Sequence, residues 1–137
     1  MKKFFIFLFF ILGICASNAE QVQVSTQTQS TTPITQAQNI AFENCTKMFP
    51  LNKENLFYLT LSAITANKFS IDEIQTNNGY IIFSVANNKY LATIAEIDSS
   101  NSILKITPCN EIYFFPSGIL INMFKYIELN LNSNIKP

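Results

Sequence analysis

The chain of 137 residues carries nine basic and nine acidic side chains, so its formal net charge is zero. Every basic residue is a lysine, and without arginine or a basic excess we expect no nucleic-acid binding. Histidine is absent too, which removes the commonest general base and the commonest metal ligand. We therefore predict no catalytic residue, no metal site and no cofactor.

The first nineteen residues have the layout of a cleaved secretory signal. Two lysines precede an apolar run over residues 4–16, and small residues follow at 17–19. The run is shorter than the ~20 apolar residues that a membrane-spanning helix needs. We predict cleavage between Ala19 and Glu20 and a periplasmic or secreted mature protein. The alternatives are lipidation at Cys15, or an uncleaved signal that tethers the chain to the membrane.

The next segment is polar and of low complexity. Residues 20–40 are rich in Gln, Thr and Ser and hold too few apolar side chains to offset the entropy of ordering them. We interpret 20–40 as a flexible linker, 41–131 as one small domain and 132–137 as a frayed tail.

A helix is predicted over 53–68, and four strands are predicted after it. Asn52 is a good N-cap, and apolar residues occupy nearly the whole helix surface, which predicts burial on more than one side. Short turn sequences, of which Asn77-Asn78-Gly79 is the strongest, separate the strands and predict an antiparallel meander. The predicted strands span 69–76, 80–86, 89–97 and 102–107.

A second helix is predicted to begin at Pro116 or Ser117. Apolar residues recur there with helical spacing, which predicts docking on the sheet, with a groove-filling helix for another protein as the alternative. The stripe consists of Leu120, Met123, Phe124, Ile127 and Leu131. The fold class is thus α+β: a four-stranded antiparallel meander, or one of five strands, flanked by an N-terminal and a C-terminal helix packed on the sheet.

Two cysteines remain after the signal is removed. Cys45 and Cys109 form an even pair in an exported chain, which favours one disulfide between the segment before the first helix and the end of the fourth strand. The alternative is two independent thiols, one buried and one exposed.

An aromatic run follows the fourth strand. Tyr113, Phe114 and Phe115 are side chains that often anchor interfaces, so they are the candidate interaction surface. The alternative is a fifth short strand, or a loop folded over the edge of the core.

Two pairs of carboxylates are candidates for acid–base chemistry or cation binding. Asp72 and Glu73 are adjacent on a strand and should point to opposite faces. Glu96 and Asp98 lie two residues apart and could share a face as an acid–base pair or in a hard-cation site. Solvated charges at a strand end are the ordinary interpretation.

These observations favour a non-enzymatic binding or scaffold module in the periplasm or outside the cell. Its expected partner is an envelope protein or a second copy of the chain, with membrane contact only through an uncleaved signal. The alternatives are a small carboxylate-dependent enzyme that uses Glu96 and Asp98, or a membrane-tethered envelope protein.

Overall fold

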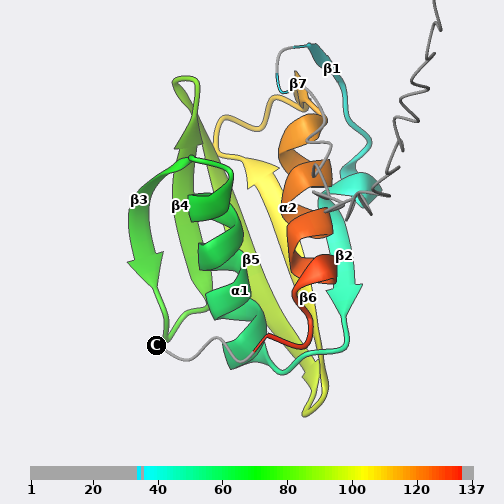
Figure 1. Cartoon of the computed structure of the whole chain (residues 1–137). Helices are drawn as coiled ribbons and strands as arrows, with labels where there is room; N and C mark the ends of the chain where they lie inside the picture. Colours follow the sequence, from blue (N-terminus) through cyan, green and yellow to red (C-terminus); the bar gives the residue numbers. More distant parts are fainter. Residues whose placement is uncertain (1–33, 35, 134–137) are drawn as a thin grey trace, which may run out of the picture.

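The computed structural model describes residue 34 and residues 36–133 (Figure 1). The predicted signal at 1–19, most of the predicted linker and residues 134–137 of the predicted tail lie outside the described residues. The described domain is α+β, with a five-stranded antiparallel sheet and two helices on one of its faces (Figure 1).

The four predicted strands form the meander that the turn sequences indicated. Each pairs antiparallel with the next, and no boundary differs from the prediction by more than one residue. The strands are β3 (Ser70–Gln75), β4 (Tyr80–Val85), β5 (Asn88–Asp98) and β6 (Asn101–Pro108).

The fifth strand of the sheet comes before the first helix, not after the fourth strand. It is β2 (Thr46–Phe49), which pairs with β6 and gives the order β2-β6-β5-β4-β3. The prediction that a helix opens the fold is therefore wrong. The chain leaves β2 at one edge of the sheet, passes sideways in a short connection, runs back along the strands in the first helix and enters β3 at the opposite edge (Figure 1).

A separate two-stranded ribbon lies beside the main sheet. It consists of β1 (Ala37–Asn39) and β7 (Phe114–Pro116), which are antiparallel (Figure 1). Part of the aromatic run is thus a strand, but it pairs outside the main sheet. The three residues of β1 were predicted to belong to the flexible linker. They are ordered as a strand because β7 supplies partners for their backbone hydrogen-bonding groups, and the sequence near β1 does not reveal that pairing.

Both helices begin close to the predicted positions. The first is α1 (Lys53–Ala66), and the Asn52 side chain accepts from the backbone N–H of Asn55 at 2.8 Å, as expected of an N-cap. The second is α2 (Gly118–Leu129). Neither of them, nor any other described helix, is long and apolar enough to cross a membrane.

The core lies between the helices and the sheet. The two helices lie side by side over the same face (Figure 1), and α1 contacts both α2 and four strands, which confirms its predicted burial on more than one side. Leu120, Met123, Phe124 and Ile127 are buried, so the stripe of α2 is core. The opposite sheet face carries half-buried side chains such as Ile82 and Leu91.

Four aromatic rings cross the sheet in one continuous file. Phe69 stacks on Phe83 with ring centroids 5.8 Å apart, and Phe83 stacks on Tyr90 at 5.6 Å. Phe115 meets Tyr90 edge-on at 5.4 Å. The file joins the β3 edge to the β1–β7 ribbon.

We expect Gly79→Ala to destabilise the protein. Gly79 has a φ of +71°, and an added Cβ would lie 2.7 Å from the backbone oxygen of Ile94. The left-handed backbone and the clash together should lower the free energy of unfolding by about 2 kcal/mol or more. Urea unfolding measures the change. Asn78→Ala, in the same exposed turn, is the control and should stay within about 0.5 kcal/mol of the parent; equal effects of the two substitutions would contradict the argument.

Candidate functional site

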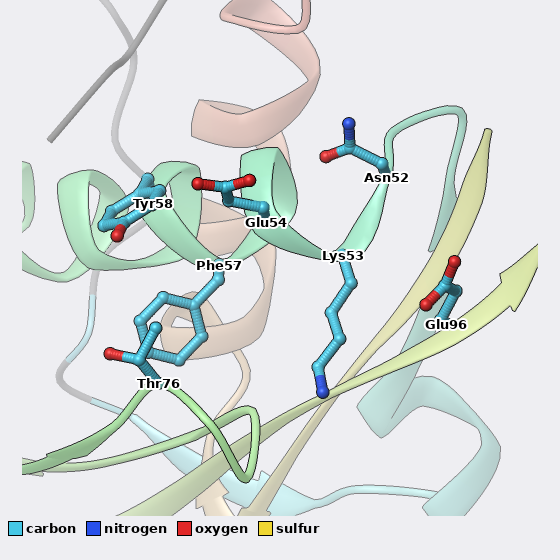
Figure 2. A pocket seen from close by; sticks show the side chains of 7 residues that line it. All are labelled: Asn52, Lys53, Glu54, Phe57, Tyr58, Thr76 and Glu96. Atoms are coloured by element: carbon cyan, nitrogen blue, oxygen red, sulfur yellow. The ribbon is translucent and has the colours of Figure 1, made fainter. Parts of the chain in front are cut away.

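A hollow of about 370 Å³ lies where α1 begins, beside the turn between β3 and β4 and the end of β5 (Figure 2). Phe57 and Tyr58 supply aromatic surface, and the other side chains that line it are polar or charged. The lining consists of Asn52, Lys53, Glu54, Phe57, Tyr58, Thr76 and Glu96.

Lys53 reaches from the first turn of α1 toward the sheet (Figure 2). An added Cβ on Gly79 would lie 2.7 Å from its Cε and 3.2 Å from its Nζ, so the end of the lysine chain packs against this glycine. Within the described residues no carboxylate lies within 4.0 Å of its ammonium. The cation is thus held by packing and not by an ion pair.

The structure separates Glu96 from Asp98. Glu96 pairs in register with the buried Ser102, shares the helix side of the sheet with it and lines the hollow. Asp98 is not part of that lining; it accepts from the backbone N–H of Ser100 at 2.8 Å and from the Asn101 side chain at 2.9 Å. A register shift between the two carboxylates accompanies this arrangement. They do not converge on a common substrate position.

The expectation that Asp72 and Glu73 point to opposite faces is wrong. Asp72 accepts from the hydroxyl of Ser84, and Glu73 accepts from the hydroxyl of Tyr80 at 2.8 Å. Both hydroxyls belong to the face of β4 turned away from the helices. A β-bulge between Ile71 and Glu73 breaks the alternation and brings both carboxylates to this face.

The predicted interaction surface divides into a buried and an exposed part. Phe115 is only 3% exposed and belongs to the core, whereas Phe114 is 57% exposed. Tyr113 is half-buried and packs edge-on against Phe42, with centroids 5.7 Å apart. Phe42 and Ile112 are themselves 53% and 59% exposed. We call Phe42, Ile112, Tyr113 and Phe114 the aromatic corner.

Charged groups surround the aromatic corner. The Nζ of Lys105 lies 4.3 Å from the centroid of the Phe42 ring, a cation–π distance. Glu43 and Glu111 are exposed next to Phe42 and Ile112 in the sequence. Desolvation raises the pKa of Tyr113, and repulsion from Cys45, which is a thiolate only at alkaline pH, and from Glu111 raises it further. The sequence did not identify Phe42, because only folding brings it next to Tyr113.

The predicted disulfide is not formed in the structure. Cys45 is buried, with its thiol 3.9 Å from the backbone oxygen of Ala41, and Cys109 is exposed. Thr46 pairs antiparallel with Lys105, so Cys45 falls opposite Ile106, and Cys109 lies three residues beyond that point. Three residues of strand span about 10 Å, whereas bridged Cα atoms lie within about 7 Å of each other. The structure thus has the alternative arrangement, one buried and one exposed thiol.

Comparison with known proteins does not assign the chain to a family. No model of a protein family matches it, and no curated protein matches its sequence. In the described part of the chain, no three Cys, Asp or Glu side chains gather as a metal site would require. The hollow and the aromatic corner are therefore the two candidate sites.

We expect the two thiols to react separately with iodoacetamide. In the folded protein Cys109 should be alkylated and Cys45 protected, and guanidinium should make Cys45 reactive as well. Burial raises the pKa of both thiols, so alkylation of Cys109 should be slow at neutral pH and quicken as the pH rises. Peptide mass spectrometry measures both sites. If neither thiol reacted in guanidinium until a reductant was added, the two would be bridged.

We expect Asp98 to stabilise the β5–β6 turn only when it is ionised. Hydrogen bonds from the Asn101 side chain, then from the backbone of Ser100, lower the pKa of Asp98 from its ordinary 3.8. A lowered folded-state pKa gives stability that is present above the unfolded value and lost as the pH falls through the folded one. Urea unfolding of the parent and Asp98→Asn should show a constant difference near neutral pH that shrinks in acid. A difference independent of pH would contradict this role.

Proposed function

We propose that this protein is an exported, non-enzymatic module that binds another protein through the aromatic corner. The observation that carries the proposal is that Phe42, Ile112 and Phe114 are each more than half exposed and all adjoin Tyr113, Phe42 through a ring contact and the other two in sequence. Large apolar side chains gathered on a surface are typical of protein-binding sites, and phenylalanine and tyrosine often supply their anchors.

The aromatic corner is held rigidly, which suits it to recognition. Phe115, the neighbour of Phe114, is buried against Tyr90 and fixes β7 to the core. The backbone N–H of Ile40 donates to the carbonyl of Tyr113 at 2.8 Å and ties the other end of the run to the segment after β1. A surface that is ordered before binding loses little entropy when a partner arrives.

The flanking charges favour a partner with basic residues beside an apolar segment. The ammonium of Lys105 lies over the Phe42 ring, and the two carboxylates of Glu43 and Glu111 outnumber it, so the rim is negative on balance. A two-fold dimer through this surface would bring the same carboxylates toward each other, which is unfavourable. The partner we propose is therefore a different protein, in the compartment to which the predicted signal directs the chain.

The carboxylate-dependent alternative receives less support from the geometry. Two carboxylates that cooperate in hydrolysis must face a common bond. Asp98 is held by its own turn, and Glu96 faces the hollow without it.

We expect a photo-crosslinker at position 114 to capture one defined partner. Benzoyl-phenylalanine in place of Phe114 should give a discrete adduct in cells that export the protein. The control is the same group in place of Leu129 on α2, which is 58% exposed against 57% for Phe114. Equal adducts at both positions, or a covalent dimer of this chain alone, would contradict the proposal.

The partner found in this way should then bind the purified protein. Ile112→Ala combined with Phe114→Ala should weaken the complex about tenfold or more, because exposed aromatic anchors dominate such interfaces. Leu129→Ala should leave the affinity unchanged. Titration calorimetry measures both, and equal affinities of the two variants would exclude the aromatic corner as the binding surface.

A further inference from the structure

We infer that the hollow at the start of α1 binds a small zwitterion, namely a free amino acid that carries an α-ammonium, an α-carboxylate and an apolar side chain. This inference is independent of protein binding at the aromatic corner. It rests on two opposite charges that face one cavity, on the aromatic surface of that cavity and on its volume.

The positive side of the hollow is Lys53. Its chain packs against Gly79 and its ammonium is held at the hollow (Figure 2). Packing restricts the side chain before a ligand arrives, so that pairing with a carboxylate costs little further entropy. The same carboxylate would meet the positive end of the α1 macrodipole, which adds to the attraction.

The negative side is Glu96, which enters the hollow from β5 while Lys53 enters from α1 (Figure 2). Glu96 forms no ion pair with Lys53 or with another lysine in the described chain. The two charges thus remain available on different walls of one cavity. Glu54, on the first turn of α1, adds a second carboxylate to the lining.

Uncharged groups complete the site. Phe57 borders the hollow but is only 2% exposed, and the half-buried Tyr58 lies next to it with the ring centroids 5.8 Å apart. The Oδ1 atom of Asn52 accepts from Asn55, so its amide nitrogen is the atom left to donate to a ligand. Thr76 adds a hydroxyl. The cavity, of about 370 Å³, is in the size range of small-molecule sites.

A zwitterion fits this lining better than a simple ion. A bare anion would gain from Lys53 but would approach Glu54 and Glu96, and a bare cation would gain from the carboxylates but approach Lys53. An amino acid satisfies both signs at once, and an apolar side chain can pack on the half-buried ring of Tyr58.

The test is a calorimetric titration of the purified mature protein with L-leucine and two analogues. N-acetyl-L-leucine lacks the ammonium, and L-leucinamide lacks the carboxylate. L-leucine should bind saturably, and each analogue should bind about tenfold more weakly, which is the effect of losing one charged hydrogen bond. No saturable binding of L-leucine up to millimolar concentration would overturn the inference.

Two variants test which side chain binds each charged group of the ligand. Lys53→Met keeps the packing chain but removes the ammonium, so it should weaken L-leucine about tenfold without weakening L-leucinamide, a cation that the lysine repels. Glu96→Gln should weaken L-leucine similarly without weakening N-acetyl-L-leucine, an anion that the glutamate repels. Retained binding of the analogue in each case also shows that the variant is folded.

Charge-matched controls lie elsewhere on the domain. Lys125→Met on α2 and Glu73→Gln on the sheet face turned away from the helices should leave L-leucine binding as in the parent. If all three compounds bound equally, or if the controls weakened L-leucine as much as Lys53→Met and Glu96→Gln, the site would not be the hollow. Neither result would bear on the partner of the aromatic corner.

Discussion

The fold depends on burial of one face of a five-stranded sheet beneath two helices. The aromatic file from Phe69 through Phe83 and Tyr90 to Phe115 supplies much of that face, and its rings come from the segment before β3, from β4, from β5 and from β7. Segments distant in the sequence are thereby joined by contacts that are both apolar and geometrically specific. No disulfide contributes among the described residues, so the apolar contacts between these layers are the main source of stability.

The path of α1 explains where the hollow lies. Because β2 and β3 are opposite edges of the sheet, the chain between them must pass from one edge to the other. A short connection after β2 carries it sideways, and α1 then runs along the strands beside α2, beginning near the end of the sheet where β2 finishes (Figure 1). The β3–β4 turn and the end of β5 reach that same end, and the space between them is the hollow (Figure 2). The close approach of Lys53 to Gly79 follows from this path, since a side chain at position 79 would meet the lysine.

The sequence was sufficient for features that depend on local patterns. Patterns of a few residues predict the N-cap of Asn52, the turn that contains Gly79 and the apolar stripe of α2, and the structure confirms all three. Strands that depend on distant partners were not predicted. The short strand β2 is defined by its pairing with β6, and β1 is defined by its pairing with β7. The bulge at Asp72 inserts one residue into a hairpin strand, which the alternation of side chains does not reveal. The separation of Cys45 from Cys109 depends on the register of β2 against β6, which are far apart in the chain and are not joined by a turn.

The two candidate sites lie at opposite ends of the same strands, and this has a consequence for how they can act. The aromatic corner follows the end of β6 and rests on the β1–β7 ribbon, whereas the hollow lies near the turn that joins β5 to β6 (Figure 1). Charges at such separations are largely screened in physiological salt. Coupling between the sites would require an element with two conformations, and each ligand would have to bind one of these conformations more tightly than the other. We therefore expect each site to be occupied independently of the other.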